Sequence, residues 1–452
     1  MLSIARHEIS IYTGHTEIFR KGFEMTKPLR LGIAGLGTVG VGVIKIIQEK
    51  KSLLEARTGK QIIISAVTAK NKDKERGVDL TPYPWEQDPI SLVKRDDVDV
   101  FIELIGGHEG VAKEALELAI KNGKDVITAN KALLAHHGQS LALIAEESGS
   151  ALRFEAAVAG GIPVIKSLTE GLAGNSISKI MGVMNGTCNY ILTRMESSGL
   201  SYEEVFSEAD DLGYLEADPN LDIGGIDAAH KLSLLSSIAF GTEVNFNGVE
   251  LDGIDKITIN DIHQAADMGY RIKLLGVSQM TSNGLEQRMA PCLVPASSPL
   301  GQLEGGTNMI VIEGDQVGQI VLRGAGAGEG PTASAVIADL ADLARGNRLT
   351  TFGQPAKTLT KAISSKSQTL APYYLRMLLH DEPGALAKIT KILSEFNVSI
   401  DRMRQYGHED ENAPVLIVTH EIRHEDLMKA IQKMPDTEVL KAQPVVIRIE
   451  VV

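Results

Sequence analysis

Short apolar runs alternate with amphipathic stretches between residues 30 and 150. Four of the runs are typical of strands, and they span residues 29–35, 62–69, 98–105 and 125–129. The stretches between them have the spacing of helices with one apolar face. Because strands that alternate with helices form parallel sheets covered on both faces, this region predicts a Rossmann-like α/β domain over residues 29–155.

The rest of the chain predicts two further domains. Residues 156–350 mix apolar helical segments with alternating runs such as residues 309–314, which favours an α+β domain. Residues 351–371 are rich in Ser, Thr and Lys and predict a linker. Beyond them the patterns follow the order βαββαβ, which predicts a ferredoxin-like unit over residues 372–452.

The N-terminal segment contains no motif that we can link to a chemistry. Residues 1–24 lack the apolar core and the small-residue cleavage site of a signal peptide. Met25 stands just before the first strand pattern, as a natural start would. We therefore expect residues 1–28 to be a disordered extension, with residues 1–24 alternatively the product of an upstream misread start.

The overall charge and cysteine content narrow the class of protein. The 452 residues include 45 basic and 58 acidic side chains, a formal net charge of −13. This balance argues against nucleic acid and anionic membranes as partners. No apolar stretch reaches the ~18 residues that cross a bilayer. With only Cys188 and Cys292 and no C-x-x-C pair, the sequence favours a reducing, cytoplasmic location.

A glycine motif follows the first strand pattern. Gly35, Gly37 and Gly40 have the G-x-G-x-x-G spacing, and an apolar helical pattern begins directly after them. In dinucleotide-binding folds these glycines allow a tight turn, approach of the pyrophosphate and close helix packing. A glycine-tolerant turn in another kind of α/β protein is the alternative.

The end of the second strand pattern bears on which dinucleotide binds. An acid about 20 residues after the glycines would accept the ribose 2′-hydroxyl of NAD. The sequence instead has Lys70, Lys72 and Lys74, and no acid before Asp73. Positive charge tolerates a 2′-phosphate, so this segment favours NADP while leaving NAD open. An ordinary exposed basic loop is the alternative.

Two further strand patterns end in residues suited to the same crevice. Gly106 and Gly107 follow one pattern, and Asn130 and Lys131 follow the next. Open α/β sheets bind ligands at the carboxyl ends of their strands. Lys131 is therefore a candidate for binding a ribose or a substrate carboxylate, although a lysine at a helix start in solvent has the same pattern.

A mostly apolar helix over residues 226–240 carries an unexpected ion pair. Asp227 and Lys231 lie one turn apart, and only His230 joins them among the titratable side chains of the helix. A buried charge is costly unless it is paired or used. One interpretation is a proton-donating lysine in a substrate pocket, with Glu216 and Asp222 placed for a substrate ammonium group. A structural ion pair is the other.

Five segments together resemble one enzyme family. They are GIAGLGTVG, TANK, MNGTCNYILT, LGYLEADPNLDIGGIDAAHKL and GAGAGEGPTASAVIADL. In this order, across roughly residues 29–350, they resemble homoserine dehydrogenases. Those enzymes reduce L-aspartate 4-semialdehyde to L-homoserine with NADPH or NADH, in threonine, methionine and isoleucine biosynthesis. The one departure is Cys188, where the family usually has threonine.

The resemblance implies roles for individual residues. Lys231 would protonate the carbonyl oxygen, and Asp227 and Glu216 would bind the substrate, with Asp222 at its ammonium end. The residues implied to contact the cofactor are Thr38, Val39, Lys131, Gly213 and Gly328. The segment FEAAVAGGIPVI resembles the family's monovalent cation site, which implies that Glu155 and the carbonyls of Val158, Gly160 and Ile162 hold sodium.

The C-terminal segment LHDEPGALAKITKIL resembles an ACT domain, a small regulatory fold that binds amino acids. This resemblance implies threonine as a candidate effector. The family resemblance implies a homodimer or homotetramer assembled through the second domain. Two other functions stay open: a dehydrogenase of another amino-acid semialdehyde, and a non-catalytic sensor of dinucleotide and amino acid.

Overall fold

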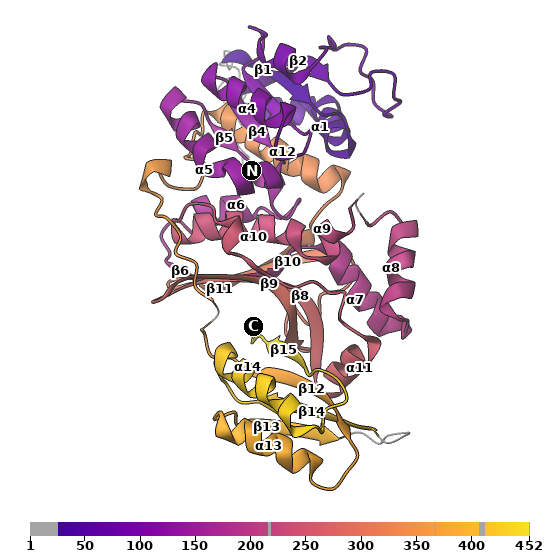
Figure 1. The fold of residues 1–452 in the computed structure, drawn as a ribbon. Helices are drawn as coiled ribbons and strands as arrows, with labels where there is room; N and C mark the ends of the chain where they lie inside the picture. The colour runs from indigo at the N-terminus through magenta and orange to yellow at the C-terminus, as the bar shows by residue number, and fades with distance from the viewer. Residues whose placement is uncertain (1–25, 216–217, 367, 406–411, 452) are drawn as a thin grey trace, which may run out of the picture.

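Three domains follow one another along the long axis of the molecule (Figure 1). The computed structural model describes residues 26–215, 218–366, 368–405 and 412–451. Most of the expected N-terminal extension lies outside these residues. The first strand begins at Thr26, inside the range that we assigned to the extension.

The N-terminal domain contains the expected parallel sheet. Its five strands lie in the order β2-β1-β3-β4-β5, with every pair parallel. The elements are β1 (Thr26–Ala34), α1 (Thr38–Glu49), α2 (Lys51–Thr58), β2 (Lys60–Thr68), α3 (Pro89–Val93), β3 (Val100–Glu103), α4 (Val111–Lys121), β4 (Asp125–Thr128), α5 (Lys131–Ser148) and β5 (Leu152–Arg153). The strands are apolar and largely buried because helices pack on both faces.

A late helix returns to complete this domain. Helix α12 (Glu329–Arg345) lies beside α1 and β4, orange among the purple elements in Figure 1. A Cβ atom added to Gly42 would lie 2.8 Å from the Glu329 Cγ, so only glycine permits this approach of α1 to α12. Helix α12, which lies within the range 156–350, therefore packs into the core of the N-terminal domain.

The central domain is a mixed sheet with helices on the side of the N-terminal domain. Helix α10 lies between the sheet and the N-terminal domain in Figure 1. The elements are α6 (Val164–Lys166), β6 (Ile177–Val183), α7 (Gly186–Ser198), α8 (Tyr202–Asp211), α9 (Asn220–Ile223), α10 (Ile226–Phe240), β7 (Glu250–Leu251), α11 (Ile259–Asp267), β8 (Tyr270–Thr281), β9 (Gly284–Pro295), β10 (Thr307–Gly314) and β11 (Gly318–Ala325).

The C-terminal domain has the expected βαββαβ order. Its elements are β12 (Tyr373–His380), α13 (Ala385–Glu395), β13 (Ile400–Gln405), β14 (Asn412–Thr419), α14 (His424–Lys433) and β15 (Val445–Ile449). Its sheet is continuous with that of the central domain, because β15 pairs in parallel with β9. The combined order is β11-β10-β6-β8-β9-β15-β12-β14-β13, with β7 paired to β9. The expected fold class is confirmed, whereas this continuity was not predicted.

The segment 351–371 connects the domains while packed against them. Phe352 is buried and its ring centroid lies 5.5 Å from that of Phe154. Thr360 forms a bridge with Thr242, and Ser364 with Leu285. These contacts hold the segment along the central domain, so it is no free linker. Across the described ranges, no helix combines the length and apolarity needed to cross a membrane.

Candidate functional site

The expected apolar helix is buried along most of its length. Helix α10 begins after Gly225, whose φ of 77° requires glycine, and each residue from Asp227 to Ser237 is buried. Asp227 lies in the first turn, where the helix dipole stabilises negative charge. The Lys231 Nζ lies 2.6 Å from the Asp227 Oδ2 and donates to the Met184 carbonyl at 2.8 Å.

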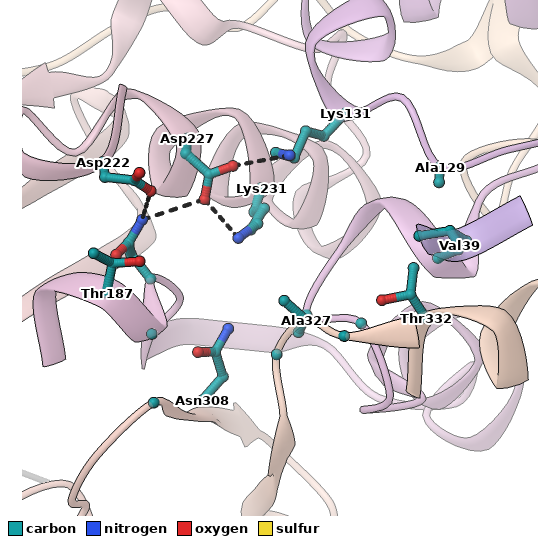
Figure 2. A pocket seen from close by; sticks show the side chains of 18 of the residues that line it. Val39, Ala129, Lys131, Thr187, Asp222, Asp227, Lys231, Asn308, Ala327 and Thr332 are labelled. Atoms are coloured by element: carbon teal, nitrogen blue, oxygen red, sulfur yellow. Dashed lines mark hydrogen bonds and ion pairs between the residues drawn. The ribbon is translucent and has the colours of Figure 1, made fainter. Parts of the chain in front are cut away.

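A second lysine reaches the same carboxylate from the other domain. Lys131 begins α5 at the carboxyl end of β4, and its Nζ lies 3.0 Å from the Asp227 Oδ1. Figure 2 shows Asp227 between the two lysines. Burial opposes ionisation of Asp227, but the two ammonium groups outweigh it and hold the pKa of this carboxyl well below its usual range.

Asn185 aligns the second carboxylate. Its Nδ2 donates to the Asp222 Oδ1 at 2.9 Å and contacts the Asp227 Oδ2 at 3.5 Å. Its Oδ1 accepts from the Cys188 N–H at 2.8 Å and so caps α7. Asp222 is buried in the short helix α9. One side chain thus fixes both carboxylates relative to the start of α7.

His230 is not a competing proton donor at neutral pH. Burial lowers its pKa to about 4. Its ring centroid lies 4.4 Å from that of Phe246 and 5.7 Å from that of His136, in the contact between α10 and α5. His230 therefore belongs to this packing contact, whereas Lys231 of the same helix lines the cavity described below.

The glycine turn has the geometry that a dinucleotide requires. A Cβ atom on Gly35 would lie 2.2 Å from the Leu104 carbonyl oxygen, and one on Gly40 would lie 2.0 Å from that of Gly35. Nothing lies within 4 Å of a Cβ atom on Gly37, so this backbone is open to a ligand. The N-terminus of α1 follows directly and offers free N–H groups to a pyrophosphate.

These parts meet in one cavity of about 560 Å³ between the N-terminal and central domains. Figure 2 shows Val39 and Thr332 on one side and the carboxylate–lysine cluster on the other. The expected residues that line it are Thr38, Val39, Lys131, Gly160, Gly213, Asp222, Asp227, Lys231 and Gly328. The cavity therefore extends from Thr38 and Val39, which directly follow Gly37 of the glycine turn, to the buried ion pair.

Other expected residues lie away from this lining. Lys70 is exposed on the loop after β2, and Gly106, at a φ of 86°, lies on the loop after β3. Glu216 lies outside the described residues. Glu155, Val158 and Ile162 are buried behind the lining. Their roles stay predictions.

Glu155 is a buried carboxylate whose charge is incompletely compensated. Its oxygens accept from the Ile165 and Lys166 N–H groups at 3.0 and 2.8 Å. Burial, with the nearby Asp339, raises its pKa to about 7. Ala159 and Gly160 both have positive φ, 56° and 51°, so the backbone turns sharply beside it. A buried carboxylate beside such a turn fits a bound cation.

The comparisons with known proteins agree with this geometry. A family model described as homoserine dehydrogenase matches residues 163–341, and one described as homoserine dehydrogenase, NAD binding domain, matches residues 35–155. A homoserine dehydrogenase of Neisseria gonorrhoeae is 42% identical over 432 residues, which are 94% of this chain and 99% of that protein.

The chain belongs to the homoserine dehydrogenase family.

Membership of this family confirms the expected NAD(P)-dependent oxidoreductase activity. An ACT domain model matches residues 373–436, which confirms the expected C-terminal domain. The crystal structure of a homoserine dehydrogenase from Thiobacillus denitrificans is similar with a TM-score of 0.89 and 39% identity, covering 94% of this chain and 98% of that one.

A hyperthermophilic archaeal homoserine dehydrogenase, solved in complex with NADPH, is more distant. It has a TM-score of 0.58 and 26% identity, covering 70% of this chain and 97% of that one.

Three polar residues that shape or line the site were not predicted from the sequence. Asn185 stands inside the motif MNGTCNYILT, so its N-cap position could have revealed it. Glu103 is buried and accepts from the Thr128 hydroxyl and the Ile105 N–H at 2.5 and 2.7 Å, which shapes the loop after β3. Asn308 lines the cavity, and its Oδ1 has no hydrogen-bond partner in the described part of the chain. The last two stand in strands without a local signal.

Asn185→Ala should affect both stability and substrate binding. We expect the free energy of unfolding to fall by about 1 kcal/mol, because α7 loses its cap. The KM for homoserine should rise, because Asp222 and Asp227 lose their shared donor. Chemical denaturation and initial rates of homoserine oxidation measure the two effects. The control is Thr258→Ala, which uncaps α11; an equal KM in both variants would refute the aligning role.

Proposed function

We propose that the protein uses this cavity to reduce the aldehyde of L-aspartate 4-semialdehyde to the alcohol of L-homoserine. The reaction is reversible and belongs to the biosynthesis of threonine, methionine and isoleucine. When bound, the nicotinamide cofactor supplies the hydride. The single observation that carries the proposal is the Lys131–Asp227–Lys231 cluster, which lies across one cavity from the glycine turn. A dehydrogenase of another semialdehyde would need a different ammonium site, and a sensor would not need a buried proton donor.

Lys231 serves as the acid in this proposal. Once the carbonyl group has accepted a hydride, the Lys231 ammonium group would give a proton to the resulting alkoxide oxygen and so yield the alcohol. Asp227 and the Met184 carbonyl hold that ammonium in the cavity wall at 2.6 and 2.8 Å. Asp222, aligned by Asn185, accepts the substrate ammonium group, and the family resemblance assigns Glu216, outside the described residues, to substrate binding as well. Lys131, which lines the cavity, is assigned in this proposal to the cofactor ribose or the substrate carboxylate.

Lys231→Ala should separate binding from chemistry. We expect kcat for homoserine oxidation to fall by at least about 100-fold, since general acid–base catalysis is lost. The Kd for NADPH should stay within a factor of about two, because the glycine turn is untouched. Lys256→Ala is the matched control, since Lys256 forms an exposed i,i+4 pair with Asp252 at 3.0 Å. Similar kcat values for the two variants would contradict the acid role.

The basic loop after β2 supports a preference for NADP. Lys70 and Lys72 are exposed there. Arg76 donates from its Nε to the Leu36 carbonyl at 3.0 Å and stacks over the Trp85 ring at 5.5 Å. This bond fixes the basic loop beside the glycine turn, where a ribose 2′-phosphate would lie.

Replacing Lys70 and Lys72 together by glutamate should discriminate between the cofactors. We expect the KM for NADPH to rise at least about tenfold more than the KM for NADH, because carboxylates repel the 2′-phosphate. Steady-state kinetics with both cofactors give the comparison. Replacing the exposed Lys50 and Lys51 by glutamate controls for the change in net charge. Equal effects on NADPH and NADH would rule out the phosphate role.

We also propose that Glu155 and the carbonyls of Val158, Gly160 and Ile162 bind a monovalent cation, with sodium as the expected ion. The support is the buried Glu155 beside the left-handed turn at Ala159 and Gly160. Sodium should raise the melting temperature of the native chain but not that of Glu155→Gln, relative to an equal concentration of choline. An equal rise in both would contradict this site.

The ACT domain supports a regulatory effector, and we propose threonine. A cavity of about 230 Å³ lies at the turn between β12 and α13, lined among others by His380, Glu382 and Gly384. Because β15 pairs with β9, removing the domain would cut the shared sheet. The test is therefore Glu382→Ala in the full chain, which should weaken threonine inhibition; identical inhibition would count against it.

The oligomeric state of the protein and its location in the cell are also proposals. We propose a homodimer or homotetramer that uses the edge of the central sheet, where Val321 of β11 and Val317 just before it are exposed. Sedimentation equilibrium measures this directly, and a monomer at micromolar concentration would refute it. The free thiols of Cys188 and Cys292 support a cytoplasmic location, which cell fractionation would check.

A further inference from the structure

One buried lysine of the central domain has no part in the proposed reaction. Lys273 belongs to β8 and is only 3% exposed. Its Nζ donates to the Asn189 Oδ1 at 3.0 Å and to the Leu303 carbonyl. Both acceptors are neutral, and burial, with Arg271 nearby, lowers the pKa of Lys273 to about 8. Keeping an ammonium group in such surroundings is costly, so these two bonds are the gain that offsets its burial.

The two acceptors of Lys273 connect a helix to a loop. Asn189 belongs to α7, which packs against β8 (Figure 1), and it is 1% exposed. Its Nδ2 donates to the Gly305 carbonyl at 2.7 Å and contacts the Leu303 carbonyl at 3.4 Å. The Lys273–Asn189 pair therefore holds residues 303–306, the loop before β10, by its backbone carbonyls.

This loop reaches the catalytic cavity. Gly306 lines it, and so does Asn308 in the strand that follows. A Cβ atom on Gly186 would lie 2.6 Å from the Gly306 carbonyl oxygen, so the loop lies directly against the first turn of α7. Figure 2 shows Asn308 and Asp222 in the same half of the view. The loop therefore borders the part of the cavity that we assign to the substrate.

Helix α7 connects the loop to the other groups around the substrate. Asn185, at its start, holds Asp222 at 2.9 Å, and Asn189, one turn later, holds the loop. Between them, the Thr187 hydroxyl donates to the carbonyl of Tyr214, another residue of the cavity lining, at 3.0 Å. A loop free to move away from α7 would therefore loosen the wall on this side.

We propose that Lys273, together with Asn189, positions the substrate side of the cavity by fixing loop 303–306 against the start of α7. Among the described residues that line the cavity, neither of the two is found, so both act through the loop. Small displacements of groups that orient a substrate weaken its productive binding. The inference rests on the proposed function, since its substrate is homoserine.

Lys273→Met tests this role, because it removes the ammonium group and keeps an unbranched side chain of similar length. We expect the KM for homoserine to rise at least about fivefold, since the substrate wall loses its support. The Kd for NADPH should stay within a factor of about two, because the glycine turn lies in the other domain. Amide hydrogen exchange in residues 300–308, followed by mass spectrometry, should become at least about fivefold faster.

Lys179→Met is the matched control. Lys179 is another largely buried lysine of the same sheet, with a side chain 18% exposed, but it pairs with Glu450 at 3.1 Å. Its removal should leave the KM for homoserine and the exchange of residues 300–308 unchanged. An equal rise in KM in both lysine variants would point to a general loss of stability and would overturn the positioning role.

Asn189→Ala supplies a second, independent variant. If Lys273 and Asn189 act as one unit, the double variant should have a KM within a factor of about two of the larger single effect. Rises in KM that multiply would overturn the shared role. If Lys273→Met does not fold, Asn189→Ala decides by the same two measurements.

The two readouts separate this inference from the proposed function. A native chain that does not oxidise homoserine would refute the proposed function, and the exchange of the loop would then decide the positioning role. In an active chain, an unchanged KM or an unchanged loop exchange in Lys273→Met would overturn the inference while the proposed function stands.

Discussion

One buried carboxylate joins the two halves of the catalytic cavity. Asp227 belongs to the central domain, and it contacts Lys231 of its own helix and Lys131 of the N-terminal domain. Removing one partner from a buried ion pair usually costs several kcal/mol, so this contact constrains how the two domains sit. The same cluster holds Lys231, the proposed proton donor, on the far side of the cavity from Val39 and Thr332. A structural ion pair and a catalytic group, which the sequence presented as alternatives, are thus compatible in one arrangement.

Chain topology reinforces this arrangement. The chain leaves the N-terminal domain after β5, builds the central domain, and returns as α12 to pack against α1. The Lys45–Glu329 ion pair at 2.8 Å and the glycine contact at Gly42 lie in this packing. The chain therefore crosses between these domains three times, after β5, before α12 and through residues 351–371. The loop that carries Gly326 and Gly328 is the second crossing, which explains why it lines the cavity.

The shared sheet gives the ACT domain a direct mechanical connection to the catalytic domain. Strands β9 and β15 pair through Cys292 and Arg448, next to the buried cluster of Arg288, Glu450 and Lys179. The other end of this connection is Gly225, on which Met289 packs. A sheet transmits small displacements because its hydrogen bonds and packed side chains resist independent movement. The ACT domain is therefore connected to the catalytic domain by a shared sheet, not by a flexible linker.

The sequence by itself determined what depends on near neighbours in the chain. Apolar periodicity was sufficient to predict the strands of the N-terminal domain, the buried helix 226–240 and the βαββαβ order, because each pattern spans only a few turns or one strand. The G-x-G-x-x-G turn at Gly35, Gly37 and Gly40 was predictable because its motif spans six residues, although the close contact of Gly35 is with Leu104, after another strand. Motif resemblance extended this to the family, and the comparisons confirmed it.

Tertiary structure alone decided which distant residues meet. Nothing local indicates that Asn185 would reach Asp222, 37 residues away, or that Arg288 would share Glu450, 162 residues away. The same holds for the return of α12 and for the pairing of β9 with β15. These contacts depend on how whole elements pack, and a lysine such as Lys131 has the same local pattern in solvent as beside a buried carboxylate. Long-range packing therefore brought the candidate residues together around one cavity.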